Sequence, residues 1–346
     1  MVSKINVLEI VKKKSPSSIL IVTGKSSYLK SPFYDYIKTI QLEYQTTLWN
    51  YSKDYPDFKE IKNFTEKKSY DFIISYGGGT VIDVAKAISV GSLLGKFSQI
   101  FDKHKINSSV YHVCVPTTFG SGSESTSFAV LYRDNIKFSI QSQEILPNEI
   151  ILDHQYTLNL TGKNSYCSVM DSFCQSIESL WSIHNTKESS KYALKSISLI
   201  SKCLKNIHNL SYNNRKNLLM ASHLSGRAIN ITRTTAPHAF SYYLTINHGI
   251  CHGEAVSVLF DRFIDLNFSS ISGPNKKKLM EILKVSNKKE LIVFFIKLKI
   301  KLGFVLSLNE IKNLNVNLYS KSINIERLKN NPIKINPLKF IKESLN

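Results

Sequence analysis

The distribution of hydrophobic residues changes partway along the 346-residue chain. Up to about residue 155, short β-branched runs alternate with helical stretches and with loops rich in glycine, serine and threonine. Apolar runs separated by helices are typical of parallel strands that are covered on both faces of a sheet. The pattern therefore predicts a parallel α/β sheet with strands at residues 18–23, 71–76, 111–115, 128–132 and 149–152.

From about Thr157 onward the hydrophobic period is that of helices, in stretches at residues 165–183, 188–206, 213–231 and 276–283. The change predicts an α/β domain over residues 1–156 and an all-helical domain over residues 157–346. The length agrees, because it is about twice the usual size of one domain. Since no repeat or low-complexity linker separates the halves, we expect them to abut and to bind ligand in the cleft between them.

Three consecutive glycines, Gly77, Gly78 and Gly79, follow the apolar run 71–76 and precede Thr80 and a helix that carries Asp83. Glycines at a strand-to-helix turn let the backbone approach a phosphate, and the helix start favours its negative charge. The alternative is a tight turn that needs positive φ. The spacing differs from the GxGxxG of the ordinary dinucleotide fold. We interpret the loop as a cradle for a pyrophosphate.

A second loop, PTTFGSGSES, follows the apolar run 111–115. Small hydroxyl side chains at the carboxyl edge of a parallel sheet suit ribose, phosphate or nicotinamide groups. The alternative is a flexible, solvent-exposed loop. Because the two loops end neighbouring strands, we expect one shared nucleotide site.

The helical half contains a constellation of metal-ligand type. Asp171 and Gln175 stand four residues apart, on one face of a helix beside its apolar stripe. Three of the nine histidines, His238, His248 and His252, fall within 15 residues. Imidazole and carboxylate ligands suit Fe(II) or Zn(II), although a lone histidine is more often structural.

The net charge of +19 is compatible with nucleic-acid binding. However, the lysine clusters are scattered, and none is interleaved with aromatic residues. We attribute the surplus to compositional bias and expect no nucleic-acid partner. A positive molecule still attracts anionic cofactors and substrates.

Cysteine usage and hydropathy indicate where the protein resides. The five cysteines form neither a CxxC motif nor an even disulfide framework. No 18-residue stretch is uninterruptedly apolar, and the first lysine cluster follows the apolar residues that it would precede in a signal peptide. We therefore expect an untargeted protein of the reducing cytoplasm, with no membrane partner.

Taken together, the segments GGGTVIDVAKA, PTTFGSGSE and MDSFCQSIE, with two histidines 14 residues apart, resemble the iron-containing (group III) alcohol dehydrogenases. Relatives of that family include dehydroquinate synthase and glycerol dehydrogenase. The resemblance covers nearly the whole chain in the right order. It implies an α/β dinucleotide-binding domain followed by an all-α domain, with the metal and the nicotinamide bound between them.

The resemblance also assigns residues. It implies NAD(P)H and a divalent metal, Fe(II) first and Zn(II) as the alternative, with Asp171, His238 and His252 as ligands. The family's fourth ligand is usually a histidine, and that position holds Gln175; a further family histidine corresponds to Tyr242. A neutral amide oxygen is a weak ligand, so looser metal binding is expected. The implied cofactor contacts are Gly77, Gly78, Gly79, Thr80, Asp83, Thr117, Thr118, Ser121, Ser125 and Lys137.

Within the family, the segments NITRTTAPHAFSYYLT and ESLWSIHNTKES look most like the phosphonoacetaldehyde reductases of phosphonate biosynthesis. This implies reduction of a small anionic aldehyde. Arg233 is the candidate for binding the anion, because guanidinium matches a phosphonate bidentately, with a solvated surface arginine as the alternative. His248 or Tyr242 is the candidate proton donor.

The sequence also bears on the choice between NADH and NADPH and leaves several alternative functions. No carboxylate follows the run 18–23 and Lys25 is present, so NADPH should be tolerated or preferred. The rivals are reduction of another aldehyde, a dehydroquinate-synthase-like lyase, and a non-catalytic nucleotide-binding protein. A homodimer is one assembly to be considered.

Overall fold

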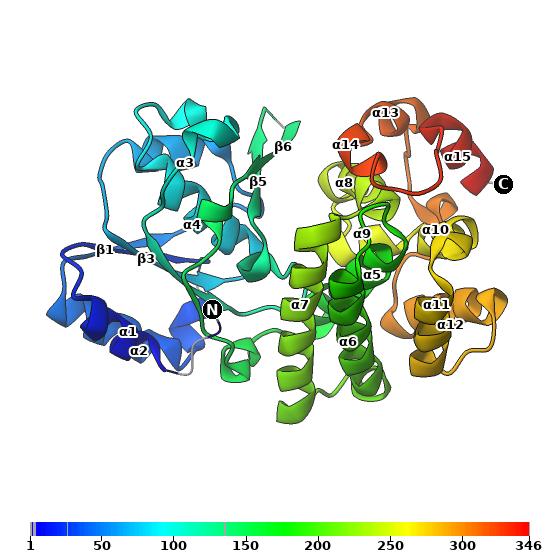
Figure 1. Ribbon diagram of the computed structural model, residues 1–346, viewed down its shortest axis with the longest axis horizontal. Coiled ribbons are helices and arrows are strands. Elements are labelled where there is room, and N and C mark those ends of the chain that lie inside the picture. The colour runs from blue at the N-terminus through cyan, green and yellow to red at the C-terminus, as the bar shows by residue number, and fades with distance from the viewer. Residues whose placement is uncertain (1, 3–4, 26, 135, 346) are drawn as a thin grey trace. The chain divides into compact units, whose positions relative to one another are not determined.

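The computed structural model describes residues 2, 5–25, 27–134 and 136–345. They divide into two compact units, residues 1–160 and 161–346 (Figure 1). The boundary expected from sequence, between residues 156 and 157, lies inside a short 3₁₀ helix, His154–Thr157, of the first unit. The fold class is confirmed, since a parallel α/β unit precedes a helical one.

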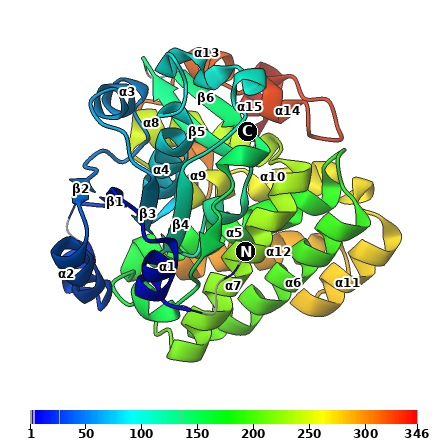
Figure 2. The same ribbon diagram turned by 60° about the vertical axis from the view of Figure 1, so that its left-hand side comes forward.

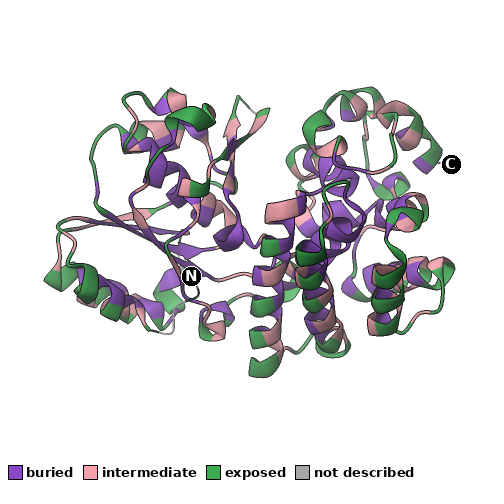
Figure 3. Ribbon diagram, in the orientation of Figure 1, coloured by how far each residue is buried: buried purple, intermediate pink, exposed green. Residues whose placement is uncertain are grey.

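The first unit is built on a five-stranded parallel sheet. Its order is β2 (Thr46–Asn50), β1 (Ile19–Thr23), β3 (Phe72–Gly77), β4 (Tyr111–Pro116) and β7 (Glu149–Ile150). Strands β1, β3 and β4 are buried almost throughout (Figure 3). Such burial on both faces explains why their sequences are apolar without alternation.

Helices cover both faces of this sheet. Ile19 and Ile21 of β1 pack in one core with α1 (Val7–Lys14) and α2 (Phe33–Glu43). Leu20 and Val22 face the other way, into a core with α3 (Phe58–Thr65) and α4 (Gly79–Gly91). Figure 2 shows α1 and α2 on one side of the sheet and α3 and α4 on the other.

One predicted strand is paired differently from the expectation. Strand β5 (Phe128–Arg133) forms an antiparallel pair with β6 (Ile136–Gln141), so its assignment to the parallel sheet was wrong. The chain reverses at Asp134, whose φ is +52°. Such a tight reversal leaves no room for the crossover that parallel pairing requires. Sequence analysis also missed β2, an edge strand whose residues are only partly buried.

The second unit is helical throughout its described length. Its helices are α5 (Gly162–Trp181), α6 (Lys187–Cys203), α7 (Tyr212–Thr232), α8 (Ala236–His248), α9 (His252–Ser257), α10 (Phe260–Asn267), α11 (Gly273–Leu283), α12 (Lys288–Leu302), α13 (Val316–Lys321), α14 (Ile325–Leu328) and α15 (Pro337–Ser344). Helix α5 packs against α6, α7 and α9. It is buried along nearly its whole length, so its polar side chains lie inside the unit and need internal partners.

Among the residues that the structure describes, no helix combines the length and the apolar character that crossing a membrane demands.

Candidate cofactor loops and metal centre

The two glycine- and serine-rich loops leave the same edge of the sheet. Gly77 at the end of β3 pairs in register with Pro116 at the end of β4, and Thr117 N–H donates to the Gly77 carbonyl at 3.0 Å. Helix α4 begins at once, with Gly78 as its N-cap. The structure thus brings together the two loops that sequence analysis assigned to one nucleotide site.

The glycines of the first loop are required by close packing. A Cβ atom on Gly78 would lie 3.0 Å from Thr118 Cγ2, and one on Gly79 would lie 2.5 Å from Ser121 Oγ. Gly78 has a φ of −81°, so the positive-φ turn considered as the alternative does not apply to it. The side chains that lie against Gly78 and Gly79 are therefore those of Thr118 and Ser121, two hydroxyl-bearing residues of the second loop.

A buried cation fastens the second loop to α4. The Nζ atom of Lys86 donates to Ser123 Oγ at 3.1 Å, to the carbonyl of Thr126 at 2.8 Å and to that of Phe128 at 3.0 Å. Asp83, one turn earlier, accepts from Ser123 Oγ and, at 2.9 Å, from Val130 N–H. Burial raises the pKa of Asp83, against the opposing effects of Lys86 and of these hydrogen bonds. Asp83, a predicted cofactor contact, thus has both carboxylate oxygens bonded within the protein.

The remaining predicted cofactor residues lie around these loops. Thr80 Oγ1 donates to the carbonyl of Asp54 at 3.0 Å. Ser125 is buried in the 3₁₀ turn Ser123–Ser125. Lys137 lies on β6, close enough for its charge to act on the Asp83 carboxylate.

Three side chains from three helices of the second unit form a metal-ligand group. Nε2 of His238 lies 3.1 Å from Asp171 Oδ1, and Nε2 of His252 lies 3.8 Å from the same oxygen. One ligand atom from each residue lies within 4.8 Å of those of the others. Asp171 and His238 are buried, whereas the His252 side chain is 39% exposed. His252 is therefore the member of the group that solvent reaches.

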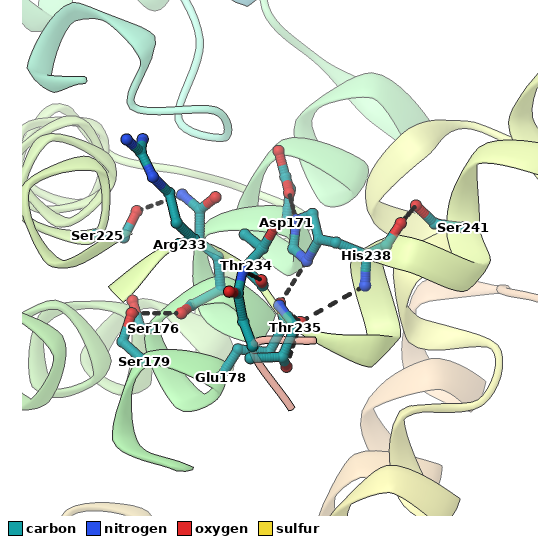
Figure 4. A network of polar contacts seen from close by, with 12 residues as sticks. Asp171, Ser176, Glu178, Ser179, Ser225, Arg233, Thr234, Thr235, His238 and Ser241 are labelled. Carbon is teal, nitrogen blue, oxygen red and sulfur yellow. Dashed lines mark hydrogen bonds and ion pairs between the residues drawn. The ribbon is translucent and has the colours of Figure 1, made fainter. Parts of the chain in front are cut away.

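Glu178 supports this group, and sequence analysis missed it. Its Oε1 accepts from Thr235 N–H and Thr235 Oγ1, both at 2.9 Å, next to the N-terminus of α8. Its Oε2 bonds Nδ1 of His238 (Figure 4). This bond leaves Nε2 directed at Asp171, the arrangement in which carboxylates orient metal-binding histidines. The available signal was a glutamate seven residues, or two helical turns, after Asp171 and therefore on the same face of the helix.

The same contacts determine the charge on His238. Burial favours the neutral ring, but the charges and hydrogen bonds of Glu178 and Asp171 outweigh it and raise the pKa of His238 to about 9. Two carboxylates around one imidazole leave negative charge at the group. A divalent cation would compensate that charge.

Gly253 is a second feature that sequence analysis missed. A Cβ atom at this position would lie 1.9 Å from the carbonyl oxygen of Cys167. Only glycine therefore lets α9 approach α5 this closely. The contact places His252, the preceding residue, beside Asp171.

Of the other predicted site residues, Tyr242 lies against a member of the metal-ligand group and His248 does not. The ring of Tyr242 is parallel to that of His252, at a centroid distance of 6.0 Å. The Gln175 amide donates to Ser225 Oγ of α7 at 2.6 Å, so this side chain also links two helices. His248 is outside the three-residue group and packs its ring against Tyr243 at 5.4 Å.

Arg233 follows the last residue of α7, with φ +58° and ψ 172°. Figure 4 shows its side chain directed away from Glu178. Positive φ in an arginine is strained and persists only where surrounding contacts enforce it.

Comparisons with known proteins place the two units of the chain in one family. The family model of the iron-containing alcohol dehydrogenases matches residues 4–154, and the model of the family's C-terminal region matches residues 166–309. A phosphonoacetaldehyde reductase of Streptomyces viridochromogenes is 30% identical over 220 residues, which are 59% of this chain and 55% of that protein. A sulfoacetaldehyde reductase of Bilophila wadsworthia is 29% identical over 234 residues, which are 64% of this chain and 59% of that protein.

The fold has solved counterparts. The crystal structure of an iron-containing alcohol dehydrogenase from Thermotoga maritima superposes with a TM-score of 0.83 at 25% identity, covering 97% of this chain and 96% of that one. The two family models together cover most of the sequence, in the order of the two structural units. The chain belongs to the iron-containing alcohol dehydrogenase family.

Proposed function

We propose that this protein reduces a small anionic aldehyde to its alcohol, using NAD(P)H and a divalent metal. The observation that carries the proposal is the group of Asp171, His238 and His252, with Glu178 bonded behind His238. Membership of the family supports a dehydrogenase reaction. Reduction adds a hydride to the carbonyl carbon and a proton to its oxygen.

The three side chains fit a divalent ion. One carboxylate and two imidazoles form the ligand set of many catalytic Zn(II) and Fe(II) centres, and His238 has its second ring nitrogen occupied by Glu178. Such an ion acts as a Lewis acid on a carbonyl oxygen. We propose Fe(II), with Zn(II) as the alternative.

The loops of the first unit would hold the cofactor. Gly78 lies so close to Thr118 that a Cβ atom would crowd it, so the start of α4 carries no side chain there. The backbone N–H groups at a helix start favour a pyrophosphate. Lys86 and Asp83 keep the hydroxyl-rich loop in place. A nicotinamide cofactor supplies the hydride. Lys25, after β1, supports acceptance of NADPH.

In the second unit, Tyr242 is the better placed of the two proposed proton donors. Its ring lies against His252, whereas His248 packs on Tyr243. Burial raises the pKa of Tyr242 to about 12, so its hydroxyl retains a proton at neutral pH. Arg233 would bind the anionic group of the aldehyde through its guanidinium.

For the substrate we propose phosphonoacetaldehyde first. The reductase of Streptomyces viridochromogenes supports it, and the sulfoacetaldehyde reductase supports a sulfonate as the rival. The test is a screen of phosphonoacetaldehyde, sulfoacetaldehyde and propanal, each with NADH and NADPH. Loss of absorbance of the reduced cofactor is followed with Fe(II), with Zn(II) and with chelator.

We expect metal-dependent consumption of reduced cofactor and the greatest kcat/KM with an anionic aldehyde. The Asp171→Asn variant serves as the control, because it loses one charged ligand without losing volume. No consumption with any aldehyde under all metal conditions would overturn the proposal. In a separate assay with a sugar phosphate as substrate, conversion without net cofactor change would instead favour the lyase.

A further inference from the structure

A second arginine, remote in sequence, reaches the same region as Arg233. Arg327 lies on α14, a short helix that belongs to none of the sequence motifs. Asn330, one turn after Arg327, is buried and donates through Nδ2 to the carbonyl of Thr234 at 3.0 Å. Its own carbonyl accepts from Ile183 N–H at 3.1 Å. The first bond ties the segment after α14 to Thr234, the residue that follows Arg233, and the second ties it to Ile183.

Arg327 also contacts the metal-ligand group through one intermediate residue. Its guanidinium donates a hydrogen bond to the hydroxyl of Tyr242. The Tyr242 ring stacks on His252, and the carboxylate of Asp171 is near enough to act on the Tyr242 hydroxyl. The guanidinium is therefore linked through one aromatic ring to His252, the exposed member of the group.

The two arginines lie close together. Burial, and after it the charge of Arg327, lower the pKa of Arg233 to about 10. Both side chains are half-buried, so water screens their repulsion incompletely. An anion bound between the two guanidinium groups would offset this repulsion.

We propose that Arg233 and Arg327 together bind the tetrahedral oxyanion of the substrate, with Arg327 determining specificity for anionic aldehydes. The inference rests on the proposed function and extends it from one cation to two. Two guanidinium groups offer bidentate donors to two edges of a tetrahedral group. Because Arg327 also bonds Tyr242, the anion would be anchored beside the proposed proton donor, with the aldehyde toward His252.

The charge of the pair separates the two oxyanion classes. A phosphonate carries up to two negative charges near neutral pH, whereas a sulfonate carries one. Two neighbouring cations therefore favour the phosphonate.

The test compares substrate selectivity in wild type, Arg327→Gln and Arg327→Lys. The measured quantity is kcat/KM for phosphonoacetaldehyde and for sulfoacetaldehyde, each divided by that for propanal. We expect Arg327→Gln to lower the phosphonate ratio by about tenfold or more, the loss typical of one charge-assisted hydrogen bond. Arg327→Lys should restore part of the loss, and the sulfonate ratio should fall less.

Two further variants separate this role from a structural one. Arg227→Gln removes the same charge from the exposed surface of α7 and should leave the ratio unchanged. Tyr242→Phe removes the bond to Arg327 and should lower turnover of all three aldehydes without changing the ratio. If Arg327→Gln lowered kcat/KM for propanal and for phosphonoacetaldehyde equally, Arg327 would only support Tyr242 and the inference would be overturned.

Binding of methylphosphonate, measured by calorimetry on metal-loaded protein, needs no turnover. If Arg327→Gln and Arg233→Gln each weaken methylphosphonate binding, the result supports an anion site formed by both arginines, even if no aldehyde is reduced. Reduction of propanal by a wild-type protein that binds no methylphosphonate would overturn the pair and leave the reductase standing.

Discussion

Glu178 bonds Nδ1 of His238 and thereby directs the opposite nitrogen of the ring at Asp171. The bond joins residues 60 positions apart in the chain. It makes the orientation of one proposed metal ligand depend on a buried carboxylate that does not itself belong to the ligand group.

The first prediction concerns this carboxylate. Glu178→Gln keeps the shape but removes the charge that orients the ring, so affinity for Fe(II) or Zn(II) should fall by about 10–100-fold. Competition with a chelator of known affinity measures it. Glu188→Gln, on the exposed face of α6, is the matched control. Equal metal affinity in wild type and Glu178→Gln would show that His238 needs no such support.

The second prediction separates two histidines. His252→Ala removes a proposed ligand and should lower metal content more than Glu178→Gln does. His248→Ala should leave metal content unchanged, because its ring packs on Tyr243 outside the group. Elemental analysis after dialysis decides. Full metal content in His252→Ala would refute the proposed ligand set.

The third prediction tests the cofactor loops. In Gly78→Val, the new Cβ would lie 3.0 Å from Thr118 Cγ2, and the valine methyl groups would fill the approach to the start of α4. The dissociation constants of NADH and NADPH should rise at least about tenfold, which corresponds to ~1.4 kcal/mol. Fluorescence titration measures both. Gly95→Val is the control, since its Cβ would have only the Gln99 side chain at 3.9 Å. A folded Gly78→Val protein that binds cofactor normally would exclude this loop.

The fourth prediction concerns Gln175. Gln175→His would supply the imidazole usual in the family, so the metal should survive dialysis against chelator longer than in wild type. The variant also loses the bond from the Gln175 amide to Ser225. Ser225→Ala isolates that loss and should reduce stability without improving metal retention. Identical retention in Gln175→His and wild type would place this residue outside the metal's coordination.

The fifth prediction is a pH dependence of stability. Asp57 caps α3 by accepting from Glu60 N–H at 2.8 Å and pairs with Lys53 at 2.9 Å. Burial opposes ionisation, but these partners together lower the pKa of Asp57. A lowered pKa in the folded state gives stability that is present above the ordinary value of about 4 and is lost as pH falls through the folded value.

Asp57→Ala should therefore cost about 1 kcal/mol at pH 7, and the difference from wild type should shrink toward pH 3. Thermal unfolding at the two pH values measures it. A difference that stayed the same at pH 3 would mean that the carboxylate charge contributes nothing to the cap.

The sequence is sufficient to predict those elements whose burial shows in a run of neighbouring residues. Runs such as ILIVT and FIISYG predict strands covered on both faces, and the structure confirms the parallel sheet that contains them. The change to a helical period predicted the all-helical second half. Asp171, His238 and His252 were inferred from a resemblance whose motifs are contiguous in the chain, and the structure brings these three together.

Which residues meet across long stretches of chain depends on how the helices and strands pack. Position 253 requires glycine because α9 packs closely on α5. Glu178 supports the group because the start of α8 lies within hydrogen-bond distance of its carboxylate. Arg327 reaches Tyr242 from α14, a helix too short to have a hydrophobic period of its own. The antiparallel pairing of β5 likewise depends on the chain reversal that follows it. Periodicity records whether a side chain is buried, but the partner of a buried polar group is set by packing between segments many residues apart.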